Sequence, residues 1–131
     1  MIRCFAVALL FALFSFCAVA QSPDPHSVPS IDAALGPCSA DFLVNDADGH
    51  PVYLAKISTR VAYGFGSFHK LDLEISTNVD GKARFTGFPA TLKHGLYFQA
   101  TDSQNRTAVA FDDPEKTCEK QFTLTLQPPP K

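Results

Sequence analysis

The side chains with which this sequence could bind a metal ion or catalyse a reaction are widely spaced. Its four histidines are His26, His50, His69 and His94, and no two have the short spacing of a metal site on one element. The segment DADG (46–49) matches the start of a calcium loop but lacks the later ligands, which favours a simple turn. No G-x-S-x-G motif surrounds a serine. The sequence therefore predicts no catalytic residue, no metal and no cofactor, and a small hydrolase remains a competing hypothesis.

The cysteines indicate an oxidising compartment. Of four cysteines, Cys4 and Cys17 lie in the apolar N-terminal segment, which leaves Cys38 and Cys118. An even pair in an exported chain predicts one disulfide. A metal site or a reactive thiol is the alternative, but neither cysteine stands in a C-x-x-C motif or beside a histidine.

Residues 1–20 have the layout of a secretory signal peptide. A short positive segment precedes an apolar stretch, and the small residues AVA end at Ala20, where cleavage is expected. The apolar stretch is too short to span a bilayer comfortably. A lipoprotein anchored through Cys17 is disfavoured, because Phe16 occupies the position that needs a small residue. We therefore expect a secreted or periplasmic protein with no stable membrane span after cleavage.

The chain after residue 20 is mildly acidic. Arg3 is one of eleven Lys and Arg, so ten remain against thirteen Asp and Glu, a net charge of −3. No basic run or stripe appears, so the sequence predicts neither nucleic-acid binding nor docking on an anionic membrane. The expected partner is a protein or a glycan of unknown identity.

The segment AYGFGSFHK (62–70) sets three aromatic residues among two glycines. The rings of Tyr63, Phe65 and Phe68 could fold back and cap the core, because glycine lets the chain turn sharply. They could also stay exposed and contact a partner, with His69 and Lys70 giving orientation. Stacking on a sugar is a further possibility, which requires Tyr63 and Phe65 to be exposed and coplanar. The spacing leaves these alternatives open.

Short alternating segments should position this loop, and they predict an all-β fold. Apolar residues alternate with polar ones as in antiparallel strands packed on one side. Seven strands at this spacing predict a sandwich of two sheets. The segments are 40–44, 51–61, 71–77, 82–85, 95–101, 107–111 and 122–126. The domain is expected at 38–126, between a flexible Pro-rich lead-in (21–37) and a Pro-rich tail (127–131).

Two blocks, VNDADGHPVYLAKI (44–57) and TNVDGKARFTGFP (77–89), carry a family resemblance. Their order and spacing resemble those of carboxypeptidase regulatory-like domains, which belong to the transthyretin-like, or prealbumin-like, β-sandwiches. The resemblance covers most of residues 40–126. It implies a seven-stranded, prealbumin-like Greek key. The positions of the two blocks that match the family pattern are expected to have structural roles. The positions expected to form turns or end strands are Asp48, Gly49, Pro51, Asp80, Gly81, Gly87 and Pro89.

The resemblance also implies a function without catalysis. Such domains serve as accessory, folding or binding modules on larger exported proteins, and a shared fold does not by itself fix a function. The related hydrolase of purine catabolism ends in Tyr-Arg-Gly-Ser, which this chain lacks. Pilin-type relatives form Lys–Asn isopeptide bonds, but the segment QFTLTL (121–126) offers no Asn. The sequence therefore predicts an exported binding or structural module that is not an enzyme.

Overall fold

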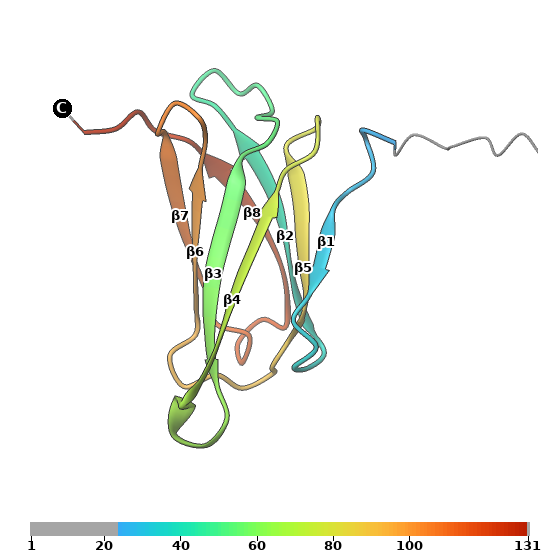
Figure 1. The fold of residues 1–131 in the computed structure, drawn as a ribbon, viewed down its shortest axis with the longest axis vertical. Helices are drawn as coiled ribbons and strands as arrows, with labels where there is room; N and C mark the ends of the chain where they lie inside the picture. Colours follow the sequence, from blue (N-terminus) through green and yellow to red (C-terminus); the bar gives the residue numbers. More distant parts are fainter. Residues whose placement is uncertain (1–23, 131) are drawn as a thin grey trace, which may run out of the picture.

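Two four-stranded β-sheets pack against each other around one core (Figure 1). This is a computed structural model, and it describes residues 24–130. The strand order is β1-β5-β2-β8 in the first sheet and β4-β3-β6-β7 in the second. The bounds are β1 Ser30–Asp32, β2 Cys38–Asn45, β3 Lys56–Tyr63, β4 His69–Ser76, β5 Lys82–Phe88, β6 Leu96–Thr101, β7 Thr107–Asp112 and β8 Glu119–Thr125. The all-β fold is confirmed, but the described strands number eight and not the predicted seven.

The additional strand, β1, lies in the segment expected to be a flexible lead-in. It pairs in parallel with β5 in the register Ser30↔Arg84 to Asp32↔Thr86. Upstream of it, the Asn78 side-chain amide donates hydrogen bonds to the carbonyls of His26 and Ser27, each at 3.1 Å. Local alternation could not reveal this strand, because it is short and its partner lies more than fifty residues away.

The predicted strand at 51–61 begins later than expected, at Lys56. Residues 51–55 form a turn in which Leu54 has a positive φ of 58°. The buried Thr77 hydroxyl holds this turn, since it accepts the Ala55 N–H at 3.0 Å and donates to the Val52 carbonyl at 2.6 Å. The β-branched and aromatic composition of the segment predicted a strand, but the contacts of Thr77 fix a turn.

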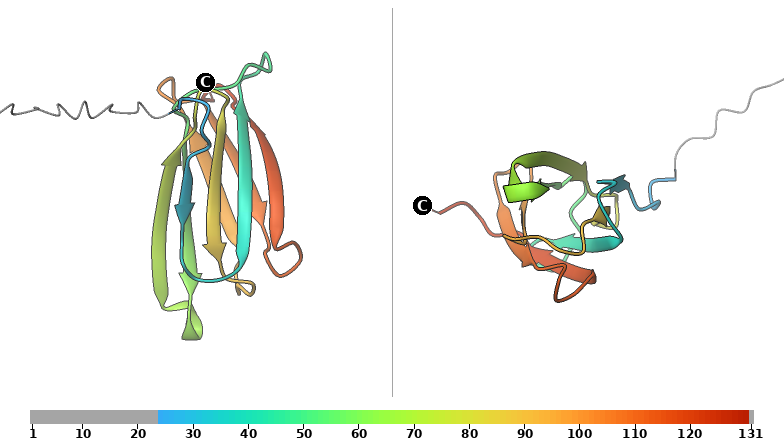
Figure 2. Two further views of the ribbon diagram at one scale, coloured as in Figure 1. Left: turned by 90° about the vertical axis from the view of Figure 1, so that its right-hand side faces the viewer. Right: turned by 90° about the horizontal axis from the view of Figure 1, so that it is seen from below.

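Alternation correctly predicted the core-facing residues. The inward side chains of β2 and β6, which include Phe42 and Phe98, are buried. Their ring centroids lie 4.7 Å apart, and the Phe85 ring lies 5.5 Å from that of Phe98. This cluster of rings belongs to the hydrophobic core. The view along the strands in Figure 2 shows the two sheets facing each other around the interior that holds this core.

The predicted disulfide between Cys38 and Cys118 is present and links residues 80 positions apart. Cys38 begins β2, and Cys118 directly precedes β8, so the bond lies where these two parallel strands start. The Ser39 N–H donates to the Cys118 carbonyl at 2.9 Å beside it. A disulfide in this place fits an oxidising compartment. The predicted signal peptide, including Cys4 and Cys17, lies outside the described residues.

Three turns of the same type lie at one end of the molecule, which we call the Asx-turn end (Figure 1). Each begins with an Asn or Asp whose Oδ1 accepts the backbone N–H groups of the third and fifth turn residues. The fourth residue has a positive φ, which is 82° at Gly49 and 74° at Gly81. The segments are 46–50, 78–82 and 102–106. Asp48–Gly49 and Asp80–Gly81, where turns were predicted, lie in the first two of these turns.

Gly87 bends the chain near the end of β5, which finishes at Phe88 just before Pro89. Its φ is 75°. A Cβ at this position would overlap the Asp32 carboxylate and lie 2.5 Å from the Ala34 backbone nitrogen. Asp32 is fixed there because it accepts the Ala34 N–H at 2.8 Å. Glycine is therefore required for both its conformation and its lack of a side chain.

Candidate binding surfaces

The segment 62–70 forms the hairpin between β3 and β4, at the end opposite the Asx turns (Figure 1). Tyr63 and His69 are the last paired residues of the two strands. A short 3₁₀ turn, Phe65–Ser67, joins them. The Ser67 N–H donates to the Gly64 carbonyl at 3.0 Å, and φ is positive at Gly64, Gly66 and Ser67. The hairpin is thus a tight turn with a defined backbone.

Two rings of the hairpin lie directly over its glycines. A Cβ on Gly64 would lie 2.8 Å from the His69 ring, and one on Gly66 would lie 2.7 Å from the Phe68 ring. The Tyr63 ring stacks on His69 with its centroid at 5.4 Å. The glycines therefore permit both the turn and the placement of these rings on the backbone.

Phe65 and Phe68 extend into solvent at the tip of the hairpin. Their residues are 94% and 80% exposed, so these rings do not cap the core, and that alternative is wrong for both. Tyr63 is half-buried and packs against the core cluster. We call Phe65 and Phe68 the aromatic tip. Exposed apolar residues that lie together in one patch often mark an interaction site.

Polar and basic groups border the aromatic tip. His69 and Lys70 follow it directly and are exposed. A hollow of about 290 Å³ lies between the hairpin and the segment 91–93, whose last residue is Lys93. The structure thus places all five predicted binding residues in one hairpin, but Tyr63 and His69 contact each other and only the two phenylalanines are free to enter an apolar site.

A second exposed apolar surface was not found by the sequence reasoning. On the outer face of the second sheet, Tyr97 of β6 lies directly opposite Phe111 of β7, and Val109 follows on the same face. Each of the three is more than half exposed. We call these three residues the aromatic face. The alternation in LYFQAT (96–101) could have placed Tyr97 on an outer face, but it could not show which residues lie beside Tyr97.

Polar residues continue the same face across β3 and β4. They line a hollow of about 400 Å³ that Tyr97 also borders. Arg60 donates to both Asp72 carboxylate oxygens, at 2.7 and 3.2 Å, and this contact lowers the pKa of Asp72. The lysine of β3, Lys56, lies 3.5 Å from Glu74. The outer face is therefore apolar over β6 and β7 and polar over β3 and β4.

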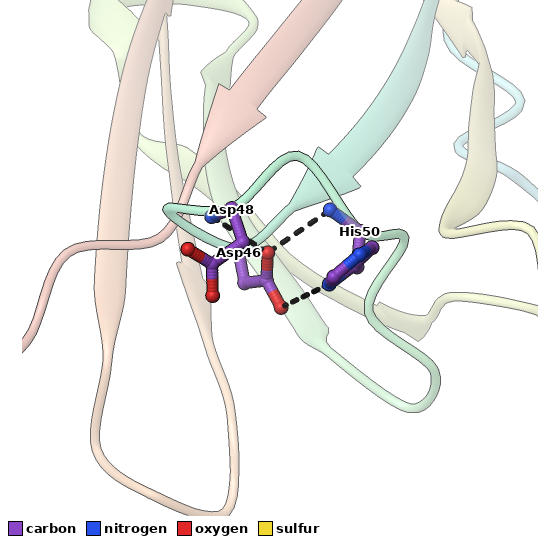
Figure 3. Close-up of side chains that lie close together, drawn as sticks. All are labelled: Asp46, Asp48 and His50. Atoms are coloured by element: carbon purple, nitrogen blue, oxygen red, sulfur yellow. Dashed lines mark hydrogen bonds and ion pairs between the residues drawn. The ribbon is translucent and has the colours of Figure 1, made fainter.

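Asp46, Asp48 and His50 lie close together in the first Asx turn (Figure 3), with possible metal-binding atoms within 4.8 Å of one another. Asp46 Oδ1 accepts the N–H groups of Asp48 and His50 at 2.9 and 3.0 Å. Its Oδ2 lies 3.8 Å from His50 Nδ1. The hydrogen bond from the His50 N–H is the main cause of the lowered pKa of Asp46.

The same turn geometry recurs at Asn78 and Asp102. The closeness of the groups around Asp46 therefore follows from the turn, in which the third and fifth residues always approach the first. In residues 24–130 this is the only group of three or more acidic, histidine or cysteine side chains that could share an ion. It supplies two carboxylates and one histidine, all from the same turn.

Asp112 is a buried acidic residue that lies just outside the strand predicted at 107–111. It ends β7 and is only 2% exposed, and its Oδ1 has no hydrogen-bond partner within residues 24–130. Loss of hydration raises the pKa of the Asp112 carboxyl, while Lys120 opposes this and Asp113 adds to it. The alternation of β7 continues one residue further than predicted, which explains the error.

Comparison with known proteins gives a similar fold but no family. No protein-family model and no curated protein sequence matches the chain. A dioxygenase domain from the cellulolytic bacterium Streptomyces sp. SirexAA-E, part of a dioxygenase carbohydrate-binding protein fusion, is 12% identical with a TM-score of 0.53. That match covers 83% of this chain and 93% of the domain. At this identity the similarity concerns the fold alone.

Two catechol dioxygenases match less well. Catechol 1,2-dioxygenase from Acinetobacter sp. ADP1 is 10% identical, with a TM-score of 0.46, over 78% of this chain and 59% of that enzyme. The 3-chlorocatechol 1,2-dioxygenase from Rhodococcus opacus 1CP is 13% identical, with a TM-score of 0.46, over 78% and 64%. The chain thus spans less than two thirds of either enzyme.

No helix in residues 24–130 is long and apolar enough to cross a membrane.

Proposed function

We propose that this protein is an exported, non-catalytic binding module that inserts its aromatic tip into an apolar site on a partner protein. The exposure of Phe65 and Phe68 carries this proposal, since both extend into solvent from a structured hairpin. Burying one phenylalanine side chain contributes about 1.5–3 kcal/mol. A partner that covers both rings would therefore gain roughly 3–6 kcal/mol from the aromatic tip alone.

The backbone of the hairpin supports this role. The 3₁₀ turn and the positive φ values fix its conformation, and the Phe68 ring rests on Gly66. Less conformational entropy is lost on binding when the contacting segment is already ordered. Lys70, beside the tip, would favour a partner site with acidic groups at its margin.

The contacts of the histidine side chains favour binding over catalysis. A hydrolase needs a nucleophile and a base in contact, together with oxyanion donors. Three of the four histidines have other contacts: His69 stacks on Tyr63, His50 lies beside Asp46 and His26 bonds to Asp80. The resemblance to carboxypeptidase regulatory-like domains, with their prealbumin-like Greek key, supports the same non-catalytic role and stays a prediction.

Export is part of the proposal. The disulfide fits an oxidising compartment, and residues 1–20 have the sequence pattern of a signal peptide. Together they support a periplasmic or secreted protein that is cleaved after Ala20.

Sugar binding at the aromatic tip is less well supported. That hypothesis requires Tyr63 and Phe65 to present exposed, coplanar rings. Phe65 is exposed, but Tyr63 is half-buried and its ring already stacks on His69.

Photo-crosslinking tests the proposed role. A photoreactive phenylalanine is placed at Phe65 or Phe68 in the native host, and adducts are identified by mass spectrometry. We expect one discrete protein adduct from each site. Tyr53 provides the matched control, because it is 58% exposed but lies just after the Asx turn 46–50. If Phe65 and Phe68 yield only intramolecular adducts, or the same adducts as position 53, the proposal is wrong.

A further inference from the structure

We propose that the outer face of the second sheet binds a neutral oligosaccharide chain laid across β6 and β3. This inference goes beyond the proposed function and concerns a different surface. It rests on the arrangement of the aromatic face, on the polar hollow beside it and on the way the charges of that hollow cancel.

The aromatic face offers a platform on which sugar rings can stack. Tyr97 and Phe111 face each other across adjacent strands and are 57% and 58% exposed. The edge of the Phe111 ring lies over Gly95, where a Cβ would approach it to 2.6 Å. This contact holds the Phe111 ring in place before a ligand arrives. The apolar C–H face of a pyranose can pack on such rings, because an aromatic side chain presents a large apolar surface.

The polar half of the face continues the platform in register. Ser58 of β3 pairs with both Gln99 of β6 and Glu74 of β4, and Gln99 pairs with Val109. These four residues therefore form one row across all four strands, about 14 Å long at the usual strand spacing. Arg60 and Asp72 begin a second, parallel row. A chain molecule lying along the rows would meet hydrogen-bonding groups at one end and apolar groups at the other.

The charges on this face favour a neutral ligand. Arg60 is paired with Asp72 and Lys56 with Glu74, so these two positive and two negative side chains cancel. Lys70 lies on the same side of β4, next to the hairpin, and adds one positive charge at that end of the face. A charged ligand would have to displace one member of a pair. Sugar hydroxyls both donate and accept, so they can bond to the remaining donors and acceptors of such pairs without separating them.

A sugar fits this surface better than a second protein does. Stable protein interfaces bury about 800 Å² on each partner around an apolar centre. Here only three exposed apolar residues lie together, beside an open polar hollow of about 400 Å³, so an apolar centre of that size is lacking. A second copy of the chain, covering Val109 and Phe111, is the main alternative, and the experiment below distinguishes it.

The test measures binding of defined sugars to the mature protein by titration calorimetry. The neutral probes are the hexasaccharides of glucose in β-1,4 and α-1,4 linkage, of xylose, of mannose and of N-acetylglucosamine. Hexagalacturonate serves as the anionic probe. We expect at least one neutral probe to bind, and hexagalacturonate to bind at least tenfold more weakly. Failure of all neutral probes, or tighter binding of hexagalacturonate, would overturn the proposal.

Matched variants locate the site. Tyr97→Ala and Phe111→Ala should each weaken binding at least tenfold, whereas Tyr53→Ala removes an equally exposed tyrosine and should leave binding unchanged. Circular dichroism and the thermal midpoint show whether each variant is folded. If Phe111→Ala does not fold, Gln99→Ala provides a second probe, in the neighbouring row of the same face. Equal binding by the folded variants would overturn the assignment.

Two further measurements separate this proposal from the others. Phe65→Ala with Phe68→Ala should leave sugar affinity unchanged, so the aromatic tip and the aromatic face can fail independently. Light scattering then tests for a second copy. A wild-type dimer that Phe111→Ala converts to a monomer would assign the aromatic face to self-association and overturn the sugar site.

Discussion

Removing the disulfide should abolish a large part of the stability of this fold. The change is Cys38→Ala with Cys118→Ala, which avoids placing a polar hydroxyl at Cys38, a fully buried position. The bond closes a loop across 80 positions. In the chain-entropy relation a loop of this length removes about 15 cal/mol/K from the unfolded chain, or roughly 4.5 kcal/mol at 25 °C. Small domains have about 5–15 kcal/mol of unfolding free energy in total.

The position of the disulfide explains why its removal should lower the stability by this amount. Strands β2 and β8 are parallel neighbours, and the pairing runs from Ser39↔Glu119 to Asn45↔Thr125. Parallel strands cannot be joined by a short turn, and nearly the whole domain lies between these two. The disulfide joins them at the residues that directly precede the first pair. Without the bond, the unfolded chain must close this long loop before the pairing can form.

Urea denaturation followed by circular dichroism measures the effect. We expect the double alanine variant to lose about 4 kcal/mol, which lowers the urea midpoint by roughly 2 M. Wild-type protein kept reduced with dithiothreitol is the control and should agree with the variant to about 1 kcal/mol. A loss of less than about 1 kcal/mol in both would refute the reasoning, because it would show that β2 and β8 keep their register without a covalent constraint.

Three other changes test single features of the fold. Gly87→Ala should lower the free energy of unfolding by about 3 kcal/mol or more in urea denaturation, because the added Cβ brings both strain at positive φ and overlap with the backbone. The control Gly49→Ala should cost only about 1–2 kcal/mol, because Gly49 has a φ of 82° but no atom within 4 Å of the added Cβ. Equal costs would contradict the close packing at Gly87. The raised pKa of Asp112 means that the folded state keeps a proton that the unfolded chain releases near 3.8, so the free energy of unfolding should fall as pH rises through the folded pKa. Asp112→Asn should remove this fall in a series of thermal midpoints from pH 3 to pH 8, and an unchanged slope would contradict the burial of the carboxylate. The contact with Asp80 raises the pKa of His26, so an NMR titration should place that pKa above 6.5 and Asp80→Asn should return it toward 6.5; no difference between the two proteins would show that the pair is absent in solution.

The sequence predicted the features that depend on local patterns. Period-two alternation identified the core-facing residues of β2 and β6 and most strand positions, because one face of each strand must be apolar. Asp-Gly and Asn-containing segments predicted turns, since only a few residue types adopt positive φ cheaply. The pairing of Cys38 with Cys118 followed from the count of cysteines in an exported chain.

The sequence could not predict features that depend on distant contacts. Strand β1 exists because its three residues align with β5, more than fifty positions away. Residues 51–55 have the composition of a strand, but the Thr77 side chain holds them in a turn. The burial of Asp112 likewise depends on how far β7 extends along β6. In each case a tertiary partner overrides or adds to the local preference.

The candidate sites show the same limit. The residues of the hairpin were identified from their types, but glycine permits both buried and exposed rings, so the exposure of Phe65 needed coordinates. The aromatic face was missed because AVAF (108–111) is apolar throughout and has the composition of a buried strand. Only the cross-strand pairing of Phe111 with Tyr97 shows that its outer side chains share an open surface.

Both ends of the described chain leave the molecule at the Asx-turn end (Figure 1). His26 contacts Asp80 in one Asx turn, and Gln127 pairs with Thr107 directly after another. A carrier protein, a resin or a sensor surface attached through either end would therefore hold the molecule by this end. The hairpin would then point away from the support, and the outer sheet face would stand along its side. Immobilised protein should accordingly present both candidate surfaces at once, whichever end is tethered.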